Sequence, residues 1–115
     1  MAKTDNTSAK GRAGEETAVA FLQSHGYRLV ARNVRLPTGE IDAICIDGTT
    51  LVFVEVKRRD GTRFGSAVAA VGGAKRAKLR ALAAEYAQIV APTARIRFDV
   101  VALDGNRVTL HRNAF

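Results

Sequence analysis

The sequence has little of what several large protein classes depend on. It contains one cysteine, Cys45, and its two histidines, His25 and His111, are far apart in the chain. An intramolecular disulfide is therefore excluded, zinc-ligand spacing is missing, and Cys45 is predicted to be a small buried hydrophobe. Apolar runs never exceed five residues, which excludes a transmembrane helix and a secretory hydrophobic segment. We therefore expect a cytoplasmic protein with no membrane partner.

Internal repeats, a glycine-rich phosphate loop and a nucleophile elbow are also missing from the sequence. The 115 residues are 47% hydrophobic and 25% charged, which is typical of one globular domain with a single modest core. Residues 1–10 are polar and are predicted to form a disordered tail, which leaves residues 11–115 as the domain.

The net charge of +7 is unevenly distributed along the chain. Residues 56–97 carry ten lysines and arginines against two acids, a balance of +8, whereas the remaining residues sum to −1. Because this basic block adjoins a group of carboxylates in sequence, we favour a surface that binds a polyanion. The alternative is a basic surface that only keeps the protein soluble.

The hydrophobic pattern predicts the element order α-β-β-β-α-β-β, an α/β fold with a mixed central sheet flanked by helices. Asp99, within the sixth element, is expected to pair with a basic residue rather than to bind a metal. The predicted elements are a helix over about Arg12–Ser24, strands over Tyr27–Arg35, Ile41–Ile46 and Leu51–Val56, a helix over about Ala74–Val90, and strands over Ala94–Leu103 and Arg107–His111.

The second and third strands are predicted to form a hairpin, because a short glycine-containing turn joins them. A turn at residues 48–49 places Asp42 directly opposite Glu55, and a four-residue loop gives the same pairing. A turn at residues 47–48 instead places Asp42 opposite Phe53, with Glu55 as its diagonal neighbour. Either register brings the two carboxylates close together on one face.

This pair of carboxylates, with Lys57 further along the same face, is typical of a metal site. Neighbouring carboxylates repel and are costly to ionise in apolar surroundings unless a cation lies between them. Mg²⁺ prefers one or two carboxylates together with water and phosphate oxygens, and Mn²⁺ is the alternative. Lys57 could deprotonate a water or neutralise phosphate charge. The alternative is an ordinary hairpin with solvated acids at its edge.

Further polar residues are placed near the hairpin by the predicted helices and strands. Glu15 shares the apolar stripe of the first helix with Ala18 and Leu22, although an acid there can also serve the helix dipole. Glu40 has the same strand parity as Asp42 and is an auxiliary candidate.

The basic residues that follow the hairpin are candidates for binding nucleic acid. Arg58 and Arg59 belong to a basic loop that is predicted to leave the third strand at Lys57. Lys75 is expected to point from the second helix toward the sheet and the carboxylates. Arg76 and Arg80, four residues apart, form a separate basic row suited to a phosphate backbone.

The spacing of Asp42 and Glu55-Val56-Lys57 resembles the PD-(D/E)XK signature of restriction-endonuclease-like nucleases. An ordered set of motifs over residues 11–103 resembles more closely the small bacterial YraN-type proteins, which are similar to archaeal Holliday-junction resolvases. These motifs are Gly14-Glu15, Gly39-Glu40-Ile41-Asp42, Val52-Phe53-Val54-Glu55-Val56-Lys57, Phe64-Gly65 and Arg97-Phe98-Asp99-Val100-Val101.

The resemblance implies a restriction-endonuclease-like core and a metal-dependent endonuclease acting on DNA, favoured over RNA, with branched or structured substrates. It implies Mg²⁺ bound by Asp42 and Glu55, with Glu15 and Lys57 as further catalytic residues and Glu40 as a recurrent partner of the aspartate. The small size of the domain favours a homodimer on a duplex junction. The alternatives are a nucleic-acid-binding module that keeps the fold without turnover, and an adaptor for an acidic protein.

Overall fold

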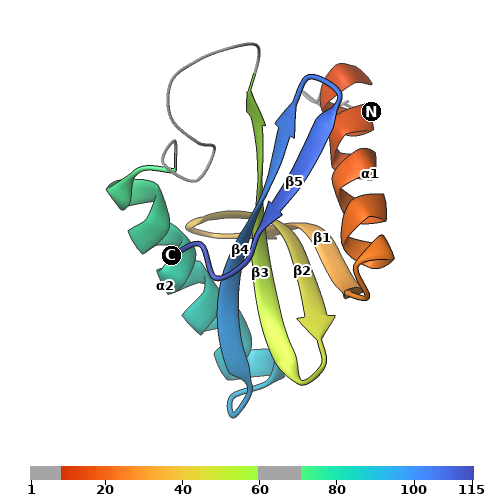
Figure 1. Ribbon diagram of the computed structural model, residues 1–115. Helices are drawn as coiled ribbons and strands as arrows, with labels where there is room; N and C mark the ends of the chain where they lie inside the picture. Colours follow the sequence, from red (N-terminus) through yellow and green to blue (C-terminus); the bar gives the residue numbers. More distant parts are fainter. Residues whose placement is uncertain (1–8, 60–70) are drawn as a thin grey trace.

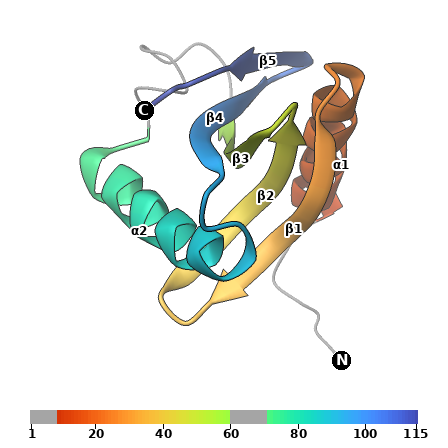
Figure 2. The same cartoon turned by 90° about the horizontal axis from the view of Figure 1, so that it is seen from below.

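The computed structural model describes residues 9–59 and 71–115. Their element order is α-β-β-β-α-β-β, as predicted, and the two helices lie on either side of a central sheet (Figures 1 and 2). Neither helix is long and apolar enough to span a membrane. The elements are α1 (Ala9–Ser24), β1 (Arg28–Leu36), β2 (Gly39–Asp47), β3 (Thr50–Arg59), α2 (Gly73–Val90), β4 (Arg95–Asp104) and β5 (Arg107–His111).

The five strands lie in the spatial order β1-β2-β3-β4-β5, so the sheet is mixed as predicted. The β3–β4 pair, joined through α2, is parallel, and every other neighbouring pair is antiparallel. Gly48, at φ +65°, forms a two-residue turn with Thr49, because Asp47 pairs directly with Thr50. The first of the two predicted registers is therefore the observed one.

Two predicted boundaries were wrong by three residues, and the others differ by two residues or fewer. The first helix begins at Ala9 rather than near Arg12, and residues 1–8 of the predicted tail lie outside the described residues. The third strand continues to Arg59, where a basic loop was predicted from Lys57 onward. The physical reason is that β3 pairs with the parallel strand β4 as far as Asp104. This pairing gives hydrogen-bond partners to the backbone N–H and C=O groups of the polar stretch.

Each helix covers its own hydrophobic cluster on one face of the sheet. The α1 cluster includes Ala18 and Leu22 of the helix with Val52 and Val54 of β3, and the α2 cluster includes Leu82 of the helix. The α1 cluster also holds Cys45, whose burial raises the pKa of its thiol to about 11, as expected for a packing residue. Both faces of the central strands are thus covered.

The β1–β2 hairpin bends sharply where Asn33 lies across from Asp42. Asn33 has φ +52°, and its neighbours in β1 pair with the residues on either side of Asp42. Regular alternation would place Ile41 on the same face as Ala43, but Ile41 instead packs with Ile44 in the α2 cluster. The bend therefore breaks the alternation of β2 at Asp42.

A buried polar network joins the C-terminal segment to the sheet and contains Asp99, whose side chain is fully buried. Asp99 accepts hydrogen bonds from Arg97 Nε (2.9 Å), Tyr27 Oη (2.6 Å) and the Asn113 backbone N–H (2.9 Å). Arg97 also contacts Asp47 at 2.9 Å. Asp99 therefore pairs with a basic residue, as predicted. Its carboxylate oxygens accept hydrogen bonds that stabilise the fold.

Candidate active site

Asp42 and Glu55 meet at the point where β2 and β3 separate. The described ladder ends at the Ala43–Val54 pair, so Asp42 and Glu55 occupy the next position in the same register. Continuing the ladder would place Ile41 opposite Val56, but the Val56 N–H donates instead to Asp42 Oδ2 at 2.8 Å. The bend therefore lets the carboxylate of Asp42 replace a strand partner, which fixes its position beside Glu55.

The environment of Asp42 disfavours its charged form. Burial, and after it the negative charge of Glu55, raise the pKa of its carboxyl from 3.8 to about 7, and the hydrogen bond from the Val56 N–H opposes both effects. Glu55 itself is only 8% exposed. Two carboxyl groups are therefore held together with one proton retained near neutral pH, an arrangement that a cation would relieve.

Two lysines contribute positive charge from different elements. Lys75 Nζ, on the first turn of α2, lies 3.6 Å from Glu55 Oε2 and also lowers the pKa of Asp42. The predicted orientation of Lys75 toward the carboxylates is confirmed, and half of its side chain remains exposed. Lys57 is half-buried and lies two positions after Glu55 in β3. Its partner in β4 is Ala102, which is buried in a cluster with Val71.

Asp42 borders a cavity on each side of the bend. The first, about 190 Å³, lies against α2 and is lined by Glu40, Lys75 and Lys78 among others. Glu40 is exposed at its rim, consistent with an auxiliary position. The second, about 170 Å³, lies on the α1 side and brings Glu15 to the same aspartate.

Glu15 thus approaches Asp42 from α1, whereas Glu55 shares its face of the sheet with α2. Asn33 Nδ2 lies 3.5 Å from Glu15 Oε1, so the bend residue holds the glutamate weakly. Within residues 9–59 and 71–115, no three histidine, cysteine, aspartate or glutamate side chains are grouped closely enough to hold a metal ion. The structure therefore brings together the Asp42–Glu55 pair, with Glu15 as a separate neighbour.

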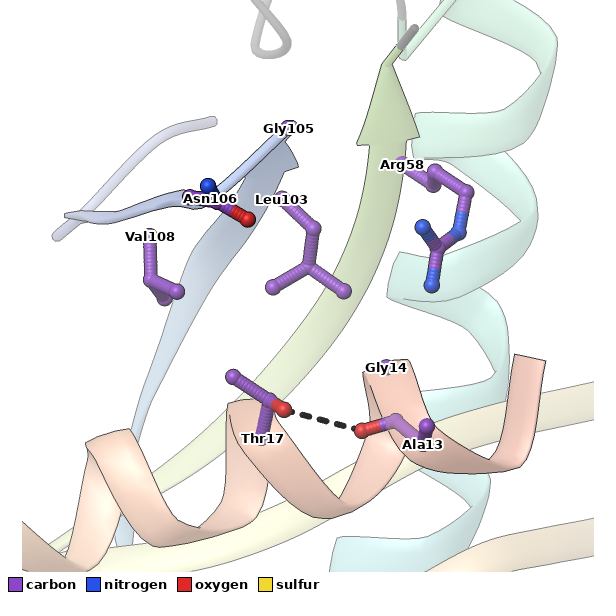
Figure 3. Close-up of a pocket in the computed structure, with 8 residues that line it drawn as sticks. All are labelled: Ala13, Gly14, Thr17, Arg58, Leu103, Gly105, Asn106 and Val108. Carbon is purple, nitrogen blue, oxygen red and sulfur yellow. Dashed lines mark hydrogen bonds between the residues drawn. The ribbon is translucent and has the colours of Figure 1, made fainter. Parts of the chain in front are cut away.

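Arg58 crosses from β3 to α1 and separates the cavity of Glu15 from a larger one. It lines both cavities together with Leu103 (Figure 3). A Cβ atom at Gly14 would overlap the Arg58 guanidinium, so this glycine is required for the close approach of the arginine to the helix. The backbone of Arg59 continues β3, and its side chain lies outside the described residues.

Arg76 and Arg80 form their predicted row on α2, but they pack on aromatic rings. Arg80 Cζ lies 5.5 Å from the ring centroid of Phe98 and 5.4 Å from that of Phe115. Arg76 Cζ lies 5.4 Å from Phe115, and its Nε donates to the Val71 carbonyl at 2.8 Å. These stacked guanidinium groups are partly committed to packing.

The donor set at the bend fits a hard divalent cation. Asp42 and Glu55 offer oxygen ligands from facing strands, and the raised pKa of Asp42 is the cost of bringing them together without a cation. Two carboxylates suffice for Mg²⁺, which retains water in its other positions. The oxygen donors of Asp42 and Glu55 and the repulsion between their charges therefore both favour a bound cation.

Sequence reasoning missed Lys78 and Asn33. Lys78 borders the Asp42 cavity because the β1–β2 turn packs on α2, where a Cβ atom at Gly39 would lie 2.9 Å from Lys78 Cε. Its spacing of three from Lys75 was the available signal. Asparagine tolerates positive φ better than most residues, which was the signal for a bend at Asn33.

Residues 14–103 match the uncharacterised protein family UPF0102. The chain is 49% identical to a UPF0102 protein of Symbiobacterium thermophilum over 91% of its own length and 94% of that protein. It is 43% identical to a UPF0102 protein of Shewanella loihica over 92% and 93%, respectively. These matches confirm the resemblance to YraN-type proteins. They cover nearly the whole chain, which therefore belongs to the UPF0102 family.

Proposed function

We propose that this protein is a metal-dependent endonuclease that hydrolyses phosphodiester bonds in DNA. The observation that carries the proposal is the Asp42–Glu55 pair, fixed by the Val56 N–H at 2.8 Å and approached by Lys75 at 3.6 Å. A partly buried carboxyl group with a raised pKa beside two cavities is a strong candidate for a reaction centre.

Asp42 and Glu55 would hold a Mg²⁺ ion, and the Val56 carbonyl is a further oxygen donor nearby. When bound, the ion would polarise the scissile phosphate and lower the pKa of an attacking water. Lys57 would orient that water or accept its proton. Lys75 would neutralise negative charge around Glu55 and the phosphate. Glu15 would complete the acidic rim on the α1 side.

Basic side chains around the site would bind the DNA backbone. Arg58 lies beside the Glu15 cavity, and Arg76 and Arg80 continue outward along α2. Stacking on Phe98 and Phe115 fixes the guanidinium plane of Arg80 while leaving its edge N–H groups to face phosphate oxygens. Such binding should weaken steeply as the salt concentration rises.

The direct test is cleavage of labelled four-way-junction, flap, duplex and single-stranded DNA with Mg²⁺, Mn²⁺ or EDTA. Glu55→Gln keeps the size of the side chain and removes its charge, and Glu85→Gln on the exposed side of α2 is the matched control. We expect metal-dependent nicking that Glu55→Gln abolishes and Glu85→Gln preserves. Nicking that survives Glu55→Gln would refute the assignment.

A second candidate is a nucleic-acid-binding module that keeps the nuclease fold without turnover. The observation that favours it is that Glu15 does not join Asp42 and Glu55 in a three-carboxylate group within the described residues. The double variant Glu55→Ala/Lys57→Ala separates the candidates, because an enzyme loses cleavage and retains salt-sensitive binding. A binding module would show no cleavage in either protein.

A further inference from the structure

A cavity beside the candidate active site lies between α1 and the β4–β5 hairpin (Figure 3). Its volume is about 320 Å³. Its helix wall is Ala13, Gly14 and Thr17, and its opposite wall includes Leu103 and Val108. This volume is at the lower end of small-molecule sites, which extend from about 300 Å³, so the cavity suits one compact group.

Polar side chains in the lining of this cavity are few, and besides Thr17 they are Asn106 and Arg58. Asn106, in the turn between β4 and β5, supplies an amide with both donor and acceptor atoms. The Thr17 hydroxyl is already bonded to the Ala13 carbonyl at 2.9 Å, so it leaves the helix wall largely apolar. Apolar walls with one amide at the edge match a nucleobase, which has apolar faces and a polar edge.

Arg58 links this cavity to the candidate site. Its side chain lines the 320 Å³ cavity, and it also lines the cavity that contains Glu15 and Asp42. A phosphate held by Arg58 would therefore lie between the Asp42 carboxylate and a base in the larger cavity. A base inside a duplex is stacked and paired, so only an unpaired nucleotide can enter such a cavity.

We propose that the cavity between α1 and the β4–β5 hairpin binds the base of one unpaired nucleotide next to the scissile phosphate. The substrate class is then nucleic acid with an unpaired nucleotide, as in a bulge, flap or open junction. This inference rests on the proposed function for the position of the scissile phosphate. The base-binding cavity itself is testable without cleavage.

The test is binding in EDTA, where a metal-dependent nuclease does not cut. An end-labelled duplex with one bulged 2-aminopurine is compared with the same duplex fully paired, by anisotropy and by 2-aminopurine fluorescence. Wild type should bind the bulged duplex about tenfold more tightly than the paired duplex, because only the bulged base can enter the cavity and bury its apolar faces against Leu103 and Val108. The fluorescence of the bulged base should change on binding.

Two variants test the cavity itself. Ala13→Phe fills it from the exposed end of α1, and Asn106→Ala removes its amide without altering a buried residue. Both should reduce the preference for the bulged duplex to about twofold or less, with paired-duplex affinity unchanged. Ala20→Phe, an exposed position of α1 outside the cavity, is the matched control and should keep the preference.

The outcomes separate this inference from the proposed function. An unchanged preference in both Ala13→Phe and Asn106→Ala overturns the cavity assignment, even if Glu55-dependent cleavage is found. Cavity-dependent binding of the bulged base without any cleavage supports the inference and overturns the endonuclease. A free deoxynucleoside monophosphate offers the same chemistry. If it competes for the cavity while bulged and paired duplexes bind equally, the site is one for mononucleotides and the inference is overturned.

Discussion

Replacing Asp42 with asparagine should stabilise the protein above neutral pH while it abolishes cleavage. The pKa of Asp42 rises from 3.8 to about 7 because of burial and the nearby charge of Glu55. The native state therefore holds a proton that the unfolded chain releases between about pH 4 and pH 7. Stability from this group is complete below that window, falls as pH rises through it, and is lowest above it.

The size of the effect follows from the same pKa values. At about 1.4 kcal/mol per pKa unit, ionisation of Asp42 costs the native state at most about 4 kcal/mol. Because Asp42 is only partly buried and borders two open cavities, we expect a smaller cost of about 1–3 kcal/mol. At roughly 4 °C per kcal/mol, Asp42→Asn should raise Tm by about 4–12 °C at pH 8.5 relative to wild type.

The assay is thermal unfolding of both proteins from pH 5 to pH 8.5 in EDTA. The asparagine oxygen can still accept from the Val56 N–H, so the substitution removes charge with little change in contacts. Asp104→Asn, at an exposed position, is the matched control and should show no such pH-dependent gain. Excess Mg²⁺ should stabilise wild type at pH 8.5 and not Asp42→Asn. A Tm difference between wild type and Asp42→Asn that is independent of pH would refute this reasoning.

Three other substitutions separate local roles. Lys75→Met removes the cation 3.6 Å from Glu55, so Mn²⁺ binding without DNA should tighten about threefold while cleavage slows; unchanged calorimetric affinity would contradict this competition. Arg97→Met leaves the fully buried Asp99 without its guanidinium partner and should cost about 3–5 kcal/mol in urea unfolding; a loss below about 1 kcal/mol would show that the network relaxes. Gly14→Ala should displace the flexible end of Arg58, so DNA binding should fall several-fold while stability changes by less than about 1 kcal/mol. A large stability loss from Gly14→Ala would mean that the helix, rather than the arginine, had moved.

The Asp42–Glu55 pairing was accessible from the sequence because its determinants are local. Gly48 favours a two-residue turn, and the turn position fixes which residues face each other across β2 and β3. The 3.6-residue periodicity of the helices likewise placed Glu15 on the buried stripe of α1 and pointed Lys75 of α2 toward the sheet.

Tertiary contacts decided what the local pattern left undetermined. The extension of β3 to Arg59 depends on parallel pairing with β4, a strand more than 30 residues later in the chain. The bend at Asn33 cannot be located from the hydrophobic pattern alone. A regular strand and an irregular strand can have the same residue composition, so composition does not show where the pairing is interrupted.

Charge placement shows the same division between local and long-range causes. The sequence contains every basic residue of the site, but it does not encode locally which ones meet a carboxylate and which ones stack on a ring. Lys75 lies at Glu55 of β3, whereas Arg80 packs on Phe98 of β4 and on Phe115. The sequence alone thus determined the facing carboxylates, and the tertiary structure determined their bend, their cavities and their neighbouring cations, because those depend on contacts between distant segments.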